Sequence, residues 1–381
     1  MQKQLRIAAV GDLMLSGGYW EQARKNETDD LFRNVAPLLD DADVAVGNLE
    51  GPLTERASAG PPWRFCLHGH PAYAQVLRKA GFGVLCLANN HMMDYGWEGV
   101  EESIQTLSEA GIHTFGAGVN LSAARNPLRL SLAGLRVAFL GYTDVPVNLP
   151  VFATKSRPGV LAAEPQAMIE DIRSAKQGSD VVVVSLHWGH EMFPYPTTRQ
   201  RKLARELISA GANVILGHHP HVLQGVEQVN EGIVAYSLGT YSVCEEEWVG
   251  QNSNGESFRL MHMGPNDGWR RQAVLNVALS GSGRVVAHGM TPTYIRPDMR
   301  VVGDPRRERI EELRRSSSAL HQPFFSWRSK TAGLFARITD WMEHIDHGTP
   351  LWKMALRVRL RHFKWIAKVL SQERQQLRGL K

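Results

Sequence analysis

Carboxylate, amide and histidine residues occur together in short blocks that lie far apart along the 381-residue chain. Carboxylate oxygen, amide oxygen and imidazole nitrogen together suit borderline divalent metals such as Mn, Fe or Zn. Two such ions need a bridging ligand, which either Asp12 or Glu50 can provide. Taken alone, each residue is as easily explained as a helix cap, a turn residue or a core histidine. The blocks give Asp12; Asn48 and Glu50; Asn90 and His91; and His187, His219 and His221.

Each of these blocks directly follows a short apolar run, and the clearest case lies between residues 180 and 225. Val181–Leu186 and Val214–Leu216 are continuous apolar runs, the pattern of strands that are buried on both faces. The helix predicted between them begins near Thr197 and ends at Gly211. This β-α-β unit brings imidazoles twice to one sheet edge, where open α/β folds place their sites. The recurrence of polar residues at strand ends therefore predicts one active-site-like cluster.

The rest of the chain alternates in the same way, which predicts a largely parallel, layered α/β fold. A late hairpin around residues 280–283 predicts additional antiparallel strands. The charge-rich sequence after Asp304 marks a change of character, so we expect a main domain over residues 1–300 and a helical extension over 301–381. The expected strands are 5–10, 43–47, 83–87, 114–118, 135–143 and 232–238, and the expected helices are 19–39, 70–80 and 97–110.

Composition limits the class of protein. Hydrophobic residues make up 43% of the chain, enough for a core, and no run approaches the roughly 18 apolar residues of a membrane-spanning helix. The first residues lack the apolar region of a secretory signal, and the three cysteines are too few and scattered for a disulfide framework. We therefore expect a cytoplasmic location.

The last segment, Pro350–Lys381, differs from the rest because it has nine basic residues against one acidic residue, Glu373. It predicts a basic amphipathic helix with aromatic residues, which can lie on the inner membrane face or bind a partner protein. The alternative is that its apolar face packs on the main domain. Nucleic-acid binding is not expected, because no recognised module accompanies the charge.

Over about residues 5 to 297, the ordered blocks resemble the CapA family of capsule and poly-γ-glutamate synthesis proteins. The resemblance implies a calcineurin-like metallophosphoesterase fold, a layered sandwich of two mixed sheets flanked by helices. The matching blocks are Gly11-Asp12 with Met14-Leu15, Asn48-Leu49-Glu50 with Pro52-Leu53-Thr54, Ala88-Asn89-Asn90-His91 with Asp94-Tyr95-Gly96, His187-Trp188-Gly189 with Glu191, Gly217-His218-His219-Pro220-His221-Val222, and Tyr236-Ser237-Leu238-Gly239.

The resemblance also implies a site with two divalent ions, Mn, Fe or Zn. His91 would be the general acid or oxyanion donor, Asp12 would be catalytic as well as a ligand, and Asn48 and Glu191 would contact the substrate. His190 and His218 fall outside the expected ligand set, and Thr240 stands where the family usually has Asn. The implied metal ligands are Asp12, Glu50, Asn90, His187, His219 and His221.

These features favour a metal-dependent hydrolase or polymer-processing enzyme of capsule or poly-γ-glutamate biosynthesis. Its substrate would be an anionic polymer or a phosphorylated or γ-linked amide compound, cleaved at a phosphoester or amide bond by a metal-activated water. The alternative is a non-catalytic assembly or polymer-binding factor of a capsule synthesis complex.

Overall fold

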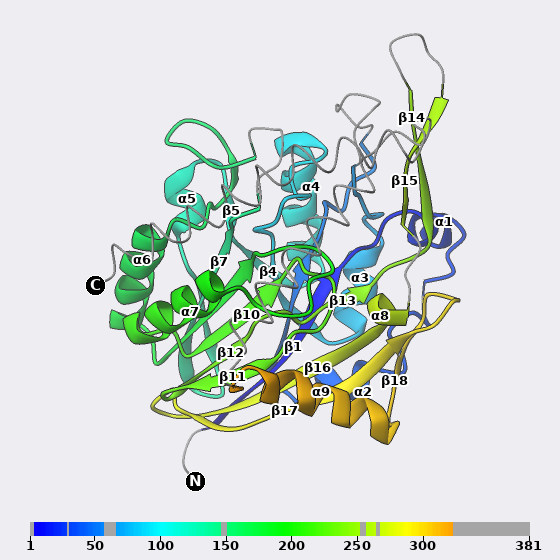
Figure 1. Cartoon of the computed structure of the whole chain (residues 1–381). Helices are drawn as coiled ribbons and strands as arrows, with labels where there is room; N and C mark the ends of the chain where they lie inside the picture. The colour runs from blue at the N-terminus through cyan, green and yellow to red at the C-terminus, as the bar shows by residue number, and fades with distance from the viewer. Residues whose placement is uncertain are drawn as a thin grey trace, which may run out of the picture. The chain divides into compact units, whose positions relative to one another are not determined.

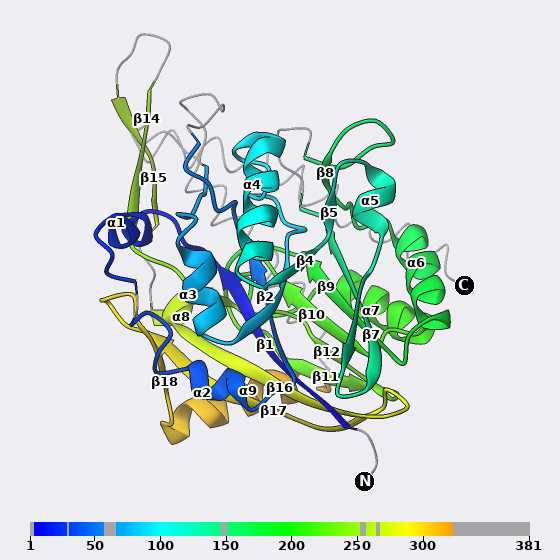
Figure 2. The ribbon, with the colours of Figure 1, turned by 180° about the vertical axis from the view of Figure 1, so that it is seen from behind.

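Two β-sheets pack face to face, and helices cover the outer face of each, so the main body has four layers (Figures 1 and 2). The computed structural model describes residues 4–28, 30–56, 66–145, 151–251, 257–263 and 267–322. For residues 246–251, 257–263 and 267, only the backbone is described.

The larger sheet has the strand order β18-β17-β16-β1-β2-β3-β4. Strands β1 to β4 run parallel, whereas β16, β17 and β18 add an antiparallel side. Strand β13 (Thr240–Ser242) pairs in parallel with the carboxyl end of β1. The other strands are β1 (Gln4–Leu13), β2 (Val44–Leu49), β3 (Phe82–Cys86), β4 (His113–Phe115), β16 (Arg271–Ser280), β17 (Val285–Ile295) and β18 (Val301–Gly303).

The smaller sheet has the order β11-β12-β10-β9-β7-β6. Its four central strands are parallel, and β11 and β6 are antiparallel edge strands. Its strands are β6 (Leu128–Leu132), β7 (Leu135–Thr143), β9 (Val181–His187), β10 (Val214–His218), β11 (Val226–Val229) and β12 (Gly232–Ala235).

Each central strand contributes apolar side chains to two hydrophobic cores, one on each face of its sheet, because successive side chains point to opposite faces. In β1, Ile7 and Ala9 lie in the core between the sheets, whereas Ala8 lies in the core under the outer helices. In β9, Val183 faces the core between the sheets, and Val184 faces the helices of the smaller sheet. Strands buried on both faces are continuously apolar for this reason.

The helices divide between the two outer faces. Helices α1 (Gly18–Arg24), α2 (Ala36–Asp40), α3 (Tyr73–Lys79) and α4 (Gly96–Glu109) contribute to the core on the larger sheet. Helices α6 (Pro165–Gln177) and α7 (Thr198–Ala210) cover the smaller sheet. Thr197 and Gln200 form a capping box that fixes the start of α7. The remaining elements are α5 (Leu121–Arg125), β5 (Ala117–Gly118), β8 (Gly159–Val160), α8 (Asp267–Arg270), α9 (Arg307–Ala319) and the hairpin of β14 (Glu246–Gln251) and β15 (Ser257–Met263).

The expected layered sandwich of two mixed sheets is confirmed, but the helical stretch expected over residues 19–39 is not continuous. Two short helices occupy this range, because Asn26 has a left-handed φ of 57° and ends the first helical stretch. A proline near its amino end starts the second helix, α2.

The first compact unit of the chain is Met1–Ala332, which extends past the boundary that we expected near residue 300. Helix α9 belongs to this unit, because Leu320 at its end lies in the core of the smaller sheet and Ser317 Oγ accepts from Val226 N. Whether residues 301–381 form a separate functional domain stays a prediction. The basic segment Pro350–Lys381 lies outside the described residues.

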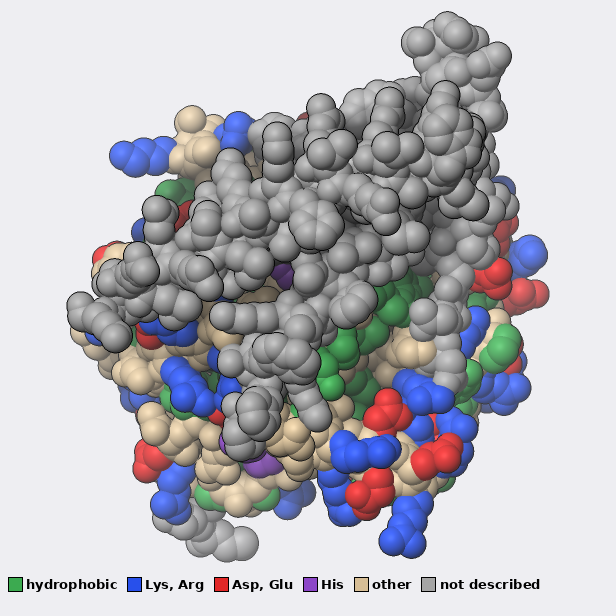
Figure 3. All heavy atoms as spheres, in the orientation of Figure 1, with side chains coloured by type: hydrophobic (Ala, Val, Ile, Leu, Met, Phe, Trp, Pro, Cys, Tyr) green, Lys and Arg blue, Asp and Glu red, His purple; other side chains and the backbone are tan. Residues whose placement is uncertain are grey.

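The described surface carries basic and acidic side chains interspersed, as the lower part of Figure 3 shows. None of the helices in the described part of the chain is long and apolar enough to span a membrane. All three cysteines are buried and unbridged.

Candidate metal centre

The predicted ligands come together at the carboxyl ends of strands from both sheets. Asp12 lies near the end of β1, after an irregularity in the pairing with β2, and Glu50 directly follows β2. His187 is the last residue of β9. His219 and His221 lie in the turn that follows β10. The face-to-face packing of the sheets therefore brings carboxylates from one sheet opposite imidazoles from the other.

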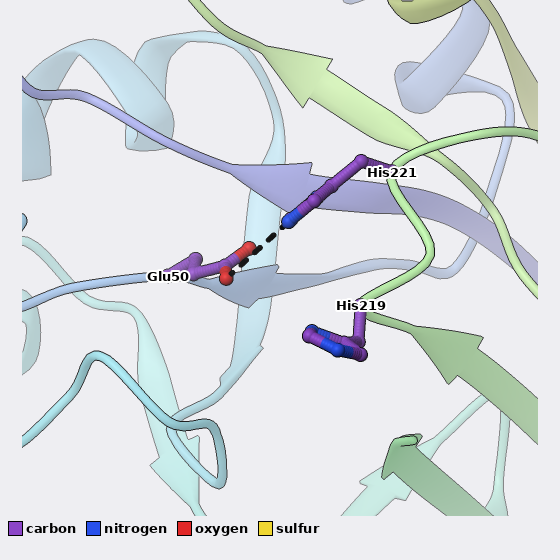
Figure 4. A group of neighbouring side chains, drawn as sticks. All are labelled: Glu50, His219 and His221. Atoms are coloured by element: carbon purple, nitrogen blue, oxygen red, sulfur yellow. Dashed lines mark ion pairs between the residues drawn. The ribbon is translucent and has the colours of Figure 1, made fainter. Parts of the chain in front are cut away.

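The donor atoms form two groups that share Glu50. Asp12, Glu50 and His187 make one group, and Glu50, His219 and His221 make the other; within each group the donor atoms lie within 4.8 Å of one another. Glu50 Oε1 lies 3.7 Å from His187 Nε2 and 3.8 Å from His221 Nε2. Figure 4 shows the ring of His221 pointing at the carboxylate of Glu50. Of the two bridging ligands that the sequence allowed, the geometry favours Glu50.

Several of these buried donor atoms have no hydrogen-bond partner among the described residues. They include both carboxylate oxygens of Glu50, Nε2 of His187, Nδ1 of His219 and Oδ1 of Asn90. Leaving a buried polar group unpaired costs about 1–3 kcal/mol. Divalent ions would satisfy these atoms, and nitrogen and oxygen donors are the types that Mn, Fe and Zn accept. The residues present therefore fit a metal centre.

Asp12 is the most strongly held carboxylate of the site. Burial raises its pKa, but the neighbouring imidazoles of His218 and His221 outweigh burial and hold the pKa well below the usual 3.8. Its Oδ1 lies 3.2 Å from His218 Nδ1, and its Oδ2 lies 3.2 Å from His221 Nδ1. The backbone N–H of His219 also donates to Oδ2, at 3.1 Å. The Asp12 carboxylate is therefore anionic and fixed in its orientation, as a metal ligand would be.

Burial also acts on the pKa values of the other expected ligands, and in all but His221 it decides the direction of the shift. Burial raises the pKa of Glu50 from 4.5 to about 8. Burial, with the charge of neighbouring imidazoles, holds the pKa of His187 well below 6.5 and lowers that of His219 to about 4. Burial also acts against the imidazolium of His221, but Glu50 and Asp12 outweigh it and raise its pKa to about 9. His187 and His219 are thus neutral and ready to donate a lone pair to a metal.

His91, the predicted general acid, is oriented by Asp94. His91 Nδ1 lies 2.7 Å from Asp94 Oδ2, which also accepts from the backbone N–H of Leu67 at 2.8 Å. Burial lowers the pKa of His91, but Asp94 and then Glu50 outweigh it, and the pKa is raised above 6.5. This shift favours the protonated imidazole, the form that a proton donor requires.

Asn48, predicted to contact substrate, has a clear structural role. It is fully buried, its Nδ2 donates to Asp12 Oδ1 at 2.8 Å, and its Oδ1 accepts from Asn89 Nδ2 at 3.2 Å. These bonds orient Asp12, and a contact of Asn48 with substrate stays a prediction.

Asn90 and Glu191 occupy different surroundings. Asn90 is buried, and its Oδ1 has no hydrogen-bond partner among the described residues, as the donor atom of a metal ligand would. Glu191 is exposed, and its charge contributes, after burial, to the raised pKa of Glu50. The ligand role of Asn90 and the substrate contact of Glu191 stay predictions.

His218 was left out of the expected ligand set, although it is buried beside Asp12. Its position on β10 is an overlooked signal, because Val214 and Leu216 face the core between the sheets and His218 shares their face. Thr240 contacts one of the predicted ligands, because its Oγ1 lies 3.1 Å from His221 Nδ1.

The fold and site thus define a two-sheet α/β sandwich with a buried histidine–carboxylate centre at the strand ends. The family model of the bacterial capsule synthesis protein PGA_cap matches residues 6–242, a range that includes every predicted ligand. The chain belongs to this family.

Two relatives at 37% identity are the capsule biosynthesis protein CapA of Bacillus anthracis, aligned over 254 residues, and the PGA biosynthesis protein CapA of Bacillus subtilis strain 168, aligned over 248 residues. These alignments cover 65% and 64% of this chain, and 61% and 64% of the two relatives. The chain therefore spans a little under two thirds of the length of each. A "probable polyglutamine synthesis accessory protein" of Mycobacterium tuberculosis is 28% identical over 237 residues, which cover 59% of this chain and 62% of that protein.

Among solved structures, a 5'-nucleotidase precursor from Thermus thermophilus matches 89% of this chain and 59% of its own, at 16% identity and a TM-score of 0.43. The NAD nucleotidase of Haemophilus influenzae gives a TM-score of 0.42 at 13% identity, over 88% of this chain and 60% of its own. Scores at this level carry no argument about function.

Proposed function

We propose that this protein is a metal-dependent hydrolase or polymer-processing enzyme of capsule or poly-γ-glutamate biosynthesis. The observation that carries the proposal is the pair of donor groups that share Glu50. Both carboxylate oxygens of Glu50 are buried and have no hydrogen-bond partner among the described residues. A structural role for Glu50 would supply hydrogen bonds to these oxygens, as it does for other buried carboxylates.

Two divalent ions bound to these groups would activate water and neutralise negative charge on the substrate. The residues of the chain divide the remaining tasks. Asp12 supplies an anionic oxygen, and His187 and His219 supply neutral nitrogen. Glu50, whose pKa is raised to about 8, would give up its proton when it binds the ions. His91, held by Asp94, would donate a proton to the leaving oxygen or nitrogen.

The substrate class that we propose is an anionic polymer or a phosphorylated or γ-linked amide precursor of one. The names of the two CapA relatives assign those proteins to capsule and PGA biosynthesis, which supports this class. Either a phosphoester or an amide bond is compatible with attack by an activated water.

A second candidate is a non-catalytic assembly factor that binds metal or polymer without turnover. The mycobacterial relative is named as an accessory protein, which favours this alternative. Loss of a metal ligand would impair capsule formation under both proposals, so purified protein has to separate them.

The first experiment measures metal content of the full chain, purified without chelators, by elemental analysis. We expect about two equivalents of Mn, Fe or Zn in the wild type, and a loss in His187→Ala and His219→Ala. His113→Ala is the matched control, because this histidine is exposed on β4, away from both donor groups. A folded wild type without metal would contradict the metal centre.

Turnover then separates enzyme from assembly factor. We expect the wild type to hydrolyse a phosphodiester or a γ-glutamyl amide and the double variant Asp12→Asn/His187→Ala to be inactive. Equal rates in the two proteins would refute the catalytic assignment. Bound metal without turnover on either substrate class would favour the assembly factor.

For location, we propose that the protein is cytoplasmic and peripheral on the inner membrane face through Pro350–Lys381. The concentration of basic and aromatic residues in this segment supports the proposal. Sedimentation with anionic liposomes should drop sharply in a chain truncated before Pro350. Unchanged sedimentation would refute a membrane role and leave a partner protein or the chain's own main domain as the binding surface.

A further inference from the structure

His221 is held in an unusual conformation by several contacts. Its backbone has a left-handed φ of 58°, which non-glycine residues rarely adopt. Its ring nitrogen Nδ1 lies 3.1 Å from Thr240 Oγ1 and 3.2 Å from Asp12 Oδ2. These contacts occupy Nδ1, so Nε2, which lies 3.8 Å from Glu50 Oε1, is the atom left to bind metal.

Thr240 contacts His221 at two points. Its hydroxyl oxygen lies 3.1 Å from the ring Nδ1 and 3.5 Å from the backbone carbonyl oxygen of the same residue. A threonine hydroxyl both accepts and donates, so it can accept from Nδ1–H while it donates to the carbonyl. Thr240 is fully buried and lies directly opposite Asp12 in the pairing of β13 with β1. It therefore fixes the ring and the main chain of His221 together.

The two donor groups differ in how much their geometry depends on side-chain contacts such as those of Thr240. Asp12 and His187 lie on strands, where ladder hydrogen bonds fix the backbone. His219 and His221 lie in a turn and both have positive φ, 92° and 58°. The group that contains these histidines thus needs contacts from outside the turn to keep its geometry.

We propose that Thr240 is a positioning residue that holds His221 and thereby sets the affinity of the Glu50–His219–His221 group for a divalent ion. This inference rests on the metal centre of the proposed function. The group of Asp12, Glu50 and His187 does not include His221, so its affinity depends less on Thr240.

The test is calorimetric titration of the metal-stripped full chain with Mn²⁺. Thr240→Val removes the hydroxyl at nearly constant volume, and Thr240→Ser keeps it. Thr293→Val is the matched control, because Thr293 is fully buried on β17 and its Oγ1 has no partner among the described residues. We expect two equivalents in the wild type, in Thr240→Ser and in Thr293→Val. In Thr240→Val one of the two should bind roughly 10- to 100-fold more weakly, the usual loss when a group that orients a ligand is removed.

Circular dichroism of the metal-free proteins checks folding, and Thr240→Ala replaces Thr240→Val if the latter does not fold. A wild type that binds two ions, with both hydroxyl-free variants binding them equally well, would overturn the role of Thr240 and leave the metal centre standing. Equal weakening in Thr240→Ser and Thr240→Val would also overturn it, because packing and not the hydroxyl would then matter. A wild type that binds no Mn²⁺ and that carries no Mn, Fe or Zn in the elemental analysis would remove the metal centre, and with it this inference.

Discussion

Replacing Glu50 by glutamine should stabilise the metal-free protein near neutral pH while abolishing its response to metal. Burial raises the pKa of Glu50 from 4.5 to about 8, so folding disfavours the ionised carboxylate. The folded state therefore binds the proton more tightly than the unfolded state does. Stability is unaffected below about pH 4.5, falls as the pH rises toward 8, and is lowest above that value.

The size of the effect follows from these two pKa values. At about 1.4 kcal/mol per pH unit between 4.5 and 7, the penalty at pH 7 is roughly 3 kcal/mol. The value of about 8 already includes the attraction of the His221 imidazolium for the ionised carboxylate, which acts against burial. We therefore expect metal-free Glu50→Gln to exceed the wild type by about 1–3 kcal/mol at pH 7, and to match it near pH 4.5.

Urea denaturation of both proteins in chelator, at several pH values, measures the difference. With Mn²⁺ at about 100 times its Kd, one bound ion adds roughly 2.7 kcal/mol to the wild type. The variant should gain little, because both donor groups include Glu50.

Glu227→Gln is the matched control. Glu227 is also buried, but it accepts hydrogen bonds from Arg201, Arg205 and Tyr236, and its pKa is lowered. The same substitution there should destabilise the protein at pH 7. A loss of stability in metal-free Glu50→Gln at pH 7 would refute the argument, because it would mean that the carboxylate has stabilising partners.

Three other substitutions test separate parts of the structure. Asp94→Asn should reduce kcat by roughly 10²-fold with little change in KM, because His91 loses the carboxylate that orients it and raises its pKa. Steady-state kinetics measure this, and an unchanged kcat would argue against His91 as the proton donor. Asn48→Leu should weaken metal binding roughly 10- to 100-fold in a Mn²⁺ titration, because Asp12 loses the hydrogen bond from Asn48 that orients it. Full affinity in this variant would show that the remaining contacts of Asp12 are enough to orient it. Trp188→Phe should lower the free energy of unfolding by about 1–3 kcal/mol, because the buried backbone carbonyl of Tyr236 loses the hydrogen bond from the indole N–H. Urea denaturation measures this, and an unchanged free energy of unfolding would contradict it.

The layered fold was largely predictable because its central strands are buried on both faces and therefore have continuous apolar sequences. The runs around Val183 and Ile215 predicted β9 and β10, and the capping signal at Thr197 predicted the start of α7 between them. The helical stretch expected over 19–39 is not continuous because one local event, the left-handed conformation of Asn26, divides it. Helix propensity does not reveal such a turn, because Asn is tolerated in both conformations.

For the site, the sequence by itself determined which residue types stand at the strand ends, because strand direction and apolar length are local properties. This was enough to select Asp12, Glu50, His187, His219 and His221, all of which the fold brings into the two donor groups. Sequence similarity to the capsule synthesis family covers the same positions.

Only the tertiary structure decided how these residues divide their tasks. That Glu50 is common to both groups, that Asn48 holds Asp12, and that Thr240 reaches His221 all depend on contacts between segments far apart in the chain. Such contacts are set by the pairing register of β1 with β2 and β13, and by the packing of one sheet on the other. A shift of a single residue in that register would turn each side chain to the opposite face, so no local pattern in the sequence can specify these partners.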